Sequence, residues 1–165
     1  MGTYVNTTDF VNKFSITTND FDAGKLDYYI DRYETITLQE LFGVELYDLW
    51  VAGIAGTDPS YETLRDAFTV QLDCGLILNS RGIEDLLLGV IYYQYKTEAF
   101  TESTITSNVK SNNETAENVG LFTANIQWRY NESIGTYAAI QEYICDNLDT
   151  YPTFKGIEKP ILLMF

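Results

Sequence analysis

The sequence predicts a mainly α-helical protein: a helical bundle with a polar, extended, hairpin-like insertion and extended arms at both ends. Apolar residues recur every three to four positions through most of the chain, and this is the period of one buried helix face. Alternation of apolar and polar residues, which is typical of strands, appears in one short segment. The length of 165 residues fits one domain, so residues 1–165 are expected to form a single helical domain.

An arm is expected before the first helix, over residues 1–19. It is rich in Thr, Asn and Asp, but its apolar side chains indicate that it docks on the protein rather than forming a free tail; they are Phe10, Val11, Phe14 and Ile16. Asn19 or Asp20 is the expected N-cap of the helix that follows, because a short polar side chain can accept a hydrogen bond from a free N–H at a helix start.

Two helices are expected in the next part of the chain. Residues 22–33 carry apolar residues at helical spacing, and Thr35 interrupts the pattern. Thr37 and Glu40 have the spacing of a capping box, in which the hydroxyl and the carboxylate each take up one free backbone N–H. A second helix is therefore expected to begin there, with a bend at Gly43.

The central segment is expected to contain a further helix and then the most strongly predicted one. Ser60 can cap a helix that runs towards Leu78, after which a polar break ends at Gly82. Residues 83–100 are apolar on almost every side of a helix, and such a helix is central and buried in a soluble protein.

A polar insertion is expected over residues 101–118, where Ser, Thr and Asn are in excess. Its alternating part predicts extended structure, and strand edges can pair with a neighbouring subunit through main-chain hydrogen bonds. The expected oligomer contacts are the residues of this alternating part: Thr104, Ile105, Thr106, Ser107, Asn108 and Val109. A long helix over residues 119–147 is expected to follow, with apolar residues at helical spacing.

The segment 151–165 is expected to be a docking tail. It is too short to have a core of its own, and Pro152 and Pro160 disfavour helix. Apolar side chains can anchor it on a partner, and two lysines add positive charge to an acidic chain; the expected partner-binding residues are Phe154, Lys155, Ile157, Lys159, Ile161, Leu163 and Phe165. The alternative is that the tail folds back across its own helices.

Charge and composition exclude several classes of function. The 24 acidic and 10 basic residues leave a net charge of −14 at pH 7, which opposes tight binding to DNA phosphates or anionic lipid. The chain has no histidine, so it lacks the usual general base, the commonest zinc ligand and every Ser-His or Cys-His mechanism. It also has no glycine-rich phosphate loop, no Gly-x-Ser-x-Gly motif and no ligand-spaced cysteine pair. We therefore expect no enzymatic activity, no cofactor and no metal site.

Other features point to a soluble protein with protein partners. The first residues lack the pattern of a signal peptide, and the longest apolar stretch, residues 86–93, is too short to span a membrane. Cys74 and Cys145 are expected to be reduced thiols in the core, as in cytosolic proteins. Aromatic residues outside the helical core faces are more typical of a protein interface than of a platform for sugars or nucleic acid; they are Tyr28, Tyr47, Tyr92 and Trp128.

The order of these segments resembles a known family. Short helices containing LQELFGVELYDLW and YETLRDAF lead into DCGLILNSRGIEDLLLGVIYYQYKTEAF, and the polar insertion TESTITSNVKSNNETAENV and a long helix follow. Over roughly residues 38–148 this arrangement is similar to the head-to-tail connector, or adaptor, proteins of tailed bacteriophages. It is most similar to the ring proteins that lie under the portal in crAss-like phages.

The resemblance implies a structural virion protein with a mainly α-helical fold. It implies a ring of about twelve identical subunits at the virion neck, made in the host cytoplasm, with the portal and adjacent neck or tail proteins as partners. DNA is then expected to pass through the ring without tight binding, because a like-charged wall repels the duplex. The alternative is an acidic helical module that binds a carbohydrate or protein ligand without catalysis.

Overall fold

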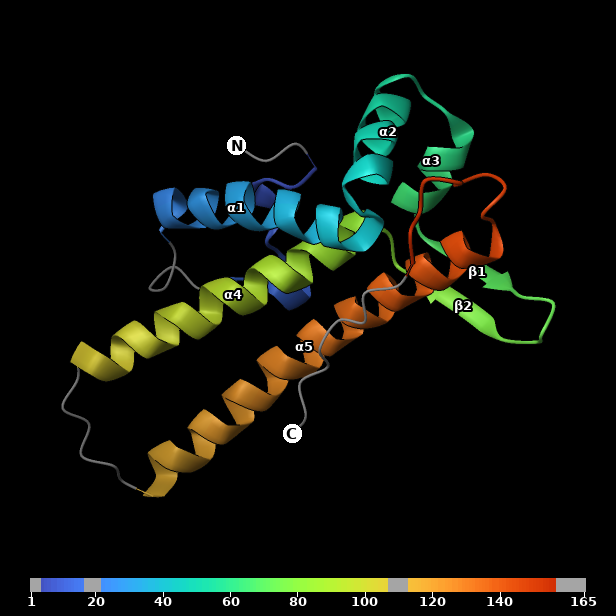
Figure 1. Cartoon of the computed structure of the whole chain (residues 1–165). Coiled ribbons are helices and arrows are strands. Elements are labelled where there is room, and N and C mark those ends of the chain that lie inside the picture. Colours follow the sequence, from blue (N-terminus) through green and yellow to red (C-terminus); the bar gives the residue numbers. More distant parts are fainter. Residues whose placement is uncertain (1–3, 17–21, 107–112, 157–165) are drawn as a thin grey trace.

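The structure, a computed structural model, describes residues 4–16, 22–106 and 113–156 (Figure 1). Most of these residues are helical, which confirms the predicted fold class: α1 (Ala23–Phe42), α2 (Val44–Ala55), α3 (Pro59–Arg65), α4 (Ile83–Thr106) and α5 (Asn113–Asp146). An antiparallel hairpin, β1 (Phe68–Gln71) and β2 (Ile77–Ser80), lies between α3 and α4 in the chain. Two short 3-10 turns, η1 (Thr7–Asp9) and η2 (Asn12–Phe14), lie in the N-terminal arm.

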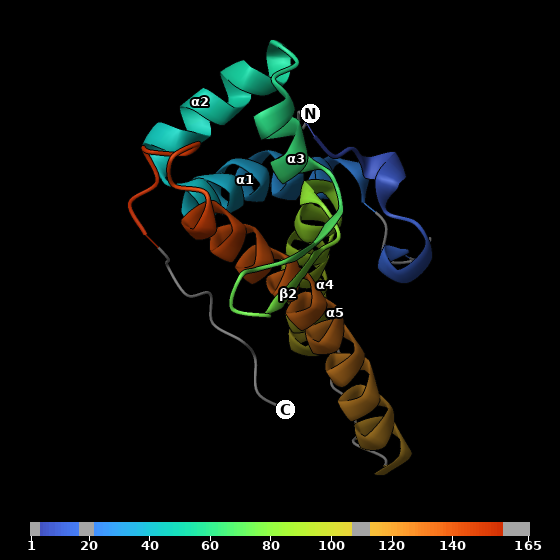
Figure 2. The same ribbon diagram turned by 90° about the vertical axis from the view of Figure 1, so that its right-hand side faces the viewer.

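α4 is the central helix of the molecule. α5 runs beside it and α1 packs against it (Figures 1 and 2). Its buried residues cover nearly every side of the helix up to Tyr95, as the sequence predicts for this segment: Ile83, Leu86, Leu87, Leu88, Val90, Ile91, Tyr92 and Tyr95. The backbones of α4 and α5 approach closely at Gly89, where a Cβ atom would lie 1.8 Å from the Oγ of Ser133. Glycine is therefore required at this contact.

Polar contacts fix the position of α5 along α4. Ser133 Oγ donates a hydrogen bond to the Asp85 carbonyl at 3.2 Å, and Arg129 Nη1 donates to the Tyr92 hydroxyl at 2.9 Å. Lys13 of the N-terminal arm adds an ion pair with Asp85, with 2.7 Å between Nζ and Oδ1. These contacts join the arm, α4 and α5 at one end of the helix pair.

The described part of the N-terminal arm is docked on the helices. Val5, Phe10 and Phe14 are buried in the core. The Glu34 carboxylate, itself buried in α1, accepts hydrogen bonds from the backbone N–H groups of Tyr4 and Val5 at 3.1 and 3.2 Å. A buried carboxylate needs such donors, so Glu34 fixes the arm in place.

α1 begins later than the sequence suggests. The Asp22 side chain is the N-cap and accepts a hydrogen bond from the Lys25 N–H at 3.1 Å. The expected caps, Asn19 and Asp20, lie outside the described residues. Several short polar residues follow one another here, and their spacing alone does not decide which of them caps the helix.

The predicted helix start at Thr37 is wrong. α1 continues through this residue to Phe42, and Thr37 is a buried residue of its interior. A capping box needs free backbone N–H groups, and in the middle of a helix these already bond to the preceding turn. The break comes instead at Gly43, whose φ of 73° lies in the region that favours glycine, so the predicted bend there is in fact a helix end.

The helix predicted from Ser60 towards Leu78 is wrong after its first two turns. α3 ends at Arg65, and Asp58 rather than Ser60 is its N-cap, with Asp58 Oδ1 accepting from the Ser60 N–H at 2.9 Å. The rest of the segment is the β1–β2 hairpin, one face of which packs on α5.

The loop of this hairpin explains why it forms. The Leu72 carbonyl accepts from the Gly75 N–H and the Leu72 N–H donates to the Leu76 carbonyl, both at 2.8 Å. Gly75 has a φ of 86°, as three-residue hairpin loops require at this position. Phe68 then packs against α5, with its ring centroid 5.0 Å from that of Tyr143.

The two cysteines are free. Cys74 is exposed in the hairpin loop, so its predicted place in the core is wrong. Cys145 is half-buried in α5, and burial raises the pKa of its thiol.

The insertion predicted over residues 101–118 is not extended where the structure describes it. α4 continues to Thr106 and α5 begins at Asn113, and residues 107–112 lie outside the described part. Adding a residue to an existing helix costs little compared with starting one, so a polar sequence continues a helix that is already formed. The helix pair extends beyond the rest of the molecule (Figures 1 and 2).

After α5 the chain returns to α3. Tyr151 and Phe154 are buried, and the Tyr151 hydroxyl donates a hydrogen bond to the Ser60 carbonyl at 2.7 Å. Tyr151 and Phe154 therefore anchor this segment in the core.

Candidate functional site

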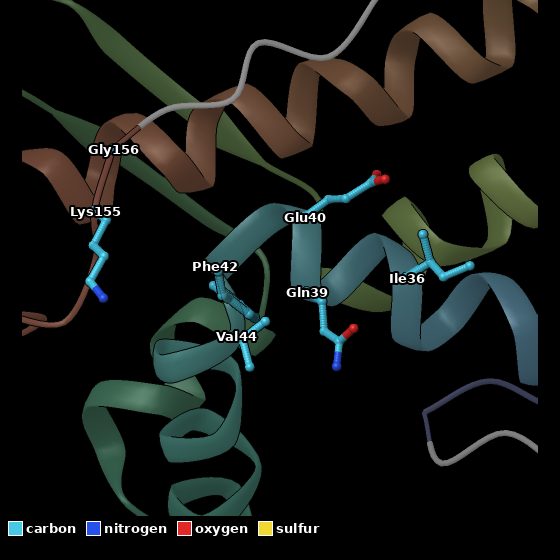
Figure 3. Close-up of a pocket in the computed structure, with 8 residues that line it drawn as sticks. Ile36, Gln39, Glu40, Phe42, Val44, Lys155 and Gly156 are labelled. Carbon is cyan, nitrogen blue, oxygen red and sulfur yellow. The ribbon is translucent and has the colours of Figure 1, made fainter.

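A groove of about 590 Å³ lies where α1 meets α2, and Lys155 and Gly156 supply one of its walls (Figure 3). α1 contributes Ile36 and Glu40, and α2 contributes Val44. Lys155 and Gly156 line the opposite side. We name this the α1–α2 groove.

The junction of α1 and α2 has its shape because Gly43 turns the chain sharply between them. The turn places Phe42 against Trp50, with 5.2 Å between their ring centroids, and both side chains are buried. α2 therefore leaves α1 at an angle and projects from the helix pair (Figure 2).

α5 holds the end of α1 in place through two hydrogen bonds. The Tyr137 hydroxyl donates to the Glu40 carbonyl at 2.8 Å, and Gln141 Nε2 donates to the Leu41 carbonyl at 3.0 Å. The last carbonyls of a helix have no partner within it, so these side chains satisfy groups that burial would otherwise leave unpaired.

An ion pair links the C-terminal wall of the groove to α2. Lys155 Nζ lies 2.5 Å from Glu45 Oε1, and both side chains are largely exposed. Exposed ion pairs contribute little to stability, about 0–1 kcal/mol. The contact shows that the chain runs beside the first turn of α2.

The lining of the groove suits a polypeptide segment better than a reacting substrate. Glu40 and Lys155 lie in water at its rim, and Ile36, Phe42 and Val44 provide apolar surface. No serine, threonine or cysteine nucleophile is among the lining residues. Within residues 4–16, 22–106 and 113–156, no group of three or more His, Cys, Asp or Glu side chains could hold a metal ion.

The groups whose pKa departs from its ordinary value lie outside the α1–α2 groove. Burial raises the pKa of Tyr4, Tyr130 and Tyr151 above the usual tyrosine value. A hydrogen bond from Arg65 lowers the pKa of Asp66. None of these groups lines the α1–α2 groove, so their shifts report packing and local pairing.

α2 carries an apolar face that the described residues leave open. Only Leu46 and Trp50 of this helix are buried. We call the stripe on its other side the α2 face: Val44, Tyr47, Val51 and Ala55. These residues follow one another at spacings of three and four, and Val44 also lines the groove, so the stripe begins there.

The α2 face is not evident from the sequence. The segment that forms α2, VELYDLWVAGIA, is apolar at most positions. That pattern predicts burial on all sides and does not show which side stays open.

The predicted partner-binding residues fall into two groups. Phe154 packs in the core and Lys155 pairs with Glu45 of the same chain. For these two residues the fold-back alternative is correct. The others lie outside the described residues: Ile157, Lys159, Ile161, Leu163 and Phe165.

The predicted oligomer contacts fall into two groups as well. Thr104, Ile105 and Thr106 form the end of α4, so the prediction that they offer a strand edge is wrong. The others lie outside the described residues: Ser107, Asn108 and Val109.

The four aromatic residues that were predicted to lie at an interface differ in their exposure to solvent. Tyr28 and Trp128 are 56% and 53% exposed, as an unoccupied interface requires, and Tyr47 is half-buried on the α2 face. Tyr92 is buried and bonded to Arg129, so placing it outside the core was wrong.

Comparisons with protein-family models, with curated proteins and with solved structures found no match. Across the described helices, none is both long enough and apolar enough to cross a membrane. Function must therefore be inferred from the surfaces and charges of the chain itself.

Proposed function

We propose that this chain is a structural virion protein, a head-to-tail connector subunit that forms a ring between the portal and the tail of a bacteriophage. The observation that carries the proposal is the helix pair α4–α5, which extends beyond the rest of the molecule (Figure 1). The order of segments, which resembles connector proteins, supports the same role.

The length of the pair suits a ring subunit. α5 has 34 residues, which corresponds to about 50 Å at 1.5 Å per residue. Its second half packs in the core through Tyr137, Ile140 and Ile144. The first half therefore gives the subunit a long side against which the next subunit can pack, and repeating such a contact closes a ring.

The charges support passage of DNA without tight binding. The cations Lys13, Arg65, Arg81 and Lys155 pair with carboxylates of the same chain. A protein that binds phosphate groups needs cations to release the counterions of DNA. The paired cations and the net charge of −14 both disfavour such contacts.

Native mass spectrometry of the purified chain, alone and with portal protein, tests the proposal. We expect a ring of about twelve copies, either spontaneously or on the portal. A chain that stays monomeric at high concentration and with portal and neck proteins present would contradict it.

A variant on the helix pair sharpens this test. Trp128→Glu places a charge on the exposed side of α5 and is expected to weaken assembly without unfolding the subunit. Leu148→Glu is the matched control, because Leu148 is 48% exposed and follows the other end of α5. If both variants assemble equally well, the exposed side of α5 at Trp128 is not part of the interface between subunits.

A further inference from the structure

α2 is the helix whose apolar side chains are least covered by the described residues. Val44 is 60% exposed, Leu49 45% and Val51 36%. Helices that are apolar on all sides are normally covered, because each apolar group in water raises the free energy of the folded state. The chain itself contains a segment that can cover this one.

The described chain ends beside α2. Gly156 lines the α1–α2 groove together with Val44, the first residue of the α2 face (Figure 3). Buried Phe154 anchors the path to this point, and Lys155 lies beside Glu45 in the first turn of α2. The described chain therefore ends near the start of the exposed stripe.

The nine remaining residues, IEKPILLMF, have the right chemistry for this surface. Apart from Glu158 and Lys159 they are all apolar. On the exposed side of α2, Asp48 lies between Val44 and Val51 and provides a negative charge for Lys159. The C-terminal residues and the α2 face thus match in two ways: both carry apolar side chains, and Lys159 and Asp48 have opposite charges.

Their length also fits. Nine residues in extended conformation span up to about 30 Å. The 12 residues of α2 correspond to about 18 Å. The segment can therefore follow the whole α2 face from the groove to Ala55.

We infer that residues 157–165 dock along the α2 face of their own subunit and cover it. The short connection to Gly156 keeps the segment near this face at an effective concentration in the millimolar range, which favours its own subunit over a second copy. This differs from the expectation that the tail docks on a partner, because the structure fixes Phe154 and Lys155 on their own domain. The inference does not depend on the connector role.

Cross-linking tests the contact directly. Ala55→Cys and Ile161→Cys are introduced together in a chain that also carries Cys74→Ser and Cys145→Ser, because both positions lie about 16 Å from the start of the α2 face. We expect a disulfide within one chain under mild oxidation at low protein concentration. When ¹⁴N-labelled and ¹⁵N-labelled protein are mixed before oxidation, each cross-linked peptide pair should carry a single isotope, because both cysteines belong to the same chain.

The matched control moves the first cysteine to another exposed apolar position. Leu76 is 51% exposed in the β-hairpin, and Leu76→Cys with Ile161→Cys should form little disulfide. Equal cross-linking of the two pairs, or disulfides found only between differently labelled chains, would overturn the inference.

Hydrogen exchange of a natural-sequence chain shortened to residues 1–156 gives an independent measurement. The shortened chain keeps Tyr151 and Phe154, so its core is intact. We expect amide exchange in α2 to become about tenfold faster than in the full chain, while exchange in α4 stays the same. Unchanged exchange in α2 would contradict the inference, and unchanged exchange with lost binding to the portal would show that the tail docks on a partner.

The result is separable from the proposed function. A ring that forms with an intrachain cross-link in place supports both proposals. A ring without that cross-link supports the connector role alone, and a cross-linked monomer supports the docked tail alone.

Discussion

α2 and the first half of α4 both carry apolar residues on most sides of the helix, but their surroundings are very different. In α4 the residues Leu86, Leu87 and Ile91 are completely buried, whereas in α2 only Leu46 and Trp50 are. α4 lies between α1 and α5 and also contacts the N-terminal arm, while the main contacts of α2 among the described elements are with α1 and α3. Apolar composition thus indicates that a helix needs a cover, and the tertiary arrangement decides what covers it.

The largest expected difference is between truncations in the two helices. Leu87→Ala removes a fully buried side chain of α4 and should lower the free energy of unfolding by about 2–5 kcal/mol. Val44→Ala removes a side chain that is 60% exposed and should lower it by less than about 1 kcal/mol. Urea unfolding followed by circular dichroism measures both.

The size of the Val44 effect also bears on the docked tail. In the chain shortened to residues 1–156, Val44→Ala should cost less than in the full chain, because the proposed cover is gone. Equal, large costs in both chains would mean that Val44 is buried by another part of the molecule.

A smaller difference is expected for two glycines at helix contacts. A Cβ at Gly89 would lie 1.8 Å from Ser133 Oγ, and a Cβ at Gly53 would lie 2.1 Å from the Tyr61 ring. Gly89→Ala forces the central helices α4 and α5 apart and should cost about 1–3 kcal/mol. Gly53→Ala should cost less, because α3 lies at the edge of the molecule and can shift.

Thermal unfolding of the two variants provides the measurement. The comparison between α2 and α4 predicts the lower melting temperature for Gly89→Ala. The reverse order would show that the α2–α3 contact is as rigid as the centre.

Tyr151 connects α3 to the C-terminal segment, and its loss should affect the α2 region more than α4. Tyr151→Phe removes the hydrogen bond to the Ser60 carbonyl and should cost about 1 kcal/mol at pH 7. Amide exchange should increase in α2 and α3 and stay unchanged in α4. If amide exchange instead becomes faster by the same factor in every helix, the substitution destabilises the whole fold rather than the α2 region.

The same tyrosine gives a pH dependence. Burial raises the pKa of Tyr151 above the ordinary value of 10, so the folded state keeps the hydroxyl proton longer than the unfolded state. Its contribution to stability is complete below pH 10 and is lost as the pH rises above that value. The free energy of unfolding should therefore fall less for Tyr151→Phe than for the parent between pH 9 and about 11.5.

The sequence predicted the central helices well because their patterns are long. The run from Ile83 is apolar on almost every side, and α5 keeps its helical spacing over many turns. Short elements were predicted poorly. β1 and β2 have four residues each, and recognising them required treating Gly75 as a turn residue rather than as an interruption of a helix.

The candidate site was predicted only in part. Phe154 and Lys155 were predicted to bind a partner, but Phe154 packs in the core of its own chain and Lys155 pairs with Glu45, 110 positions away in the sequence. Spacing within a segment carries no information about such a contact. The polar insertion was predicted as extended because local composition was considered without the helices on either side of it.

The smallest expected effect has the opposite sign. Gly135 lies in the middle of α5, and a Cβ there would meet no atom of the described residues within 4 Å. Glycine in a helix interior costs about 0.5–1 kcal/mol relative to alanine, so Gly135→Ala should raise the free energy of unfolding by up to that amount. Differential scanning calorimetry should show a higher melting temperature, whereas Gly89→Ala, on the neighbouring helix of the same pair, should show a lower one. A lower value for Gly135→Ala would mean that this side of α5, which lines a groove of about 540 Å³ beside β2, is already occupied in the free subunit.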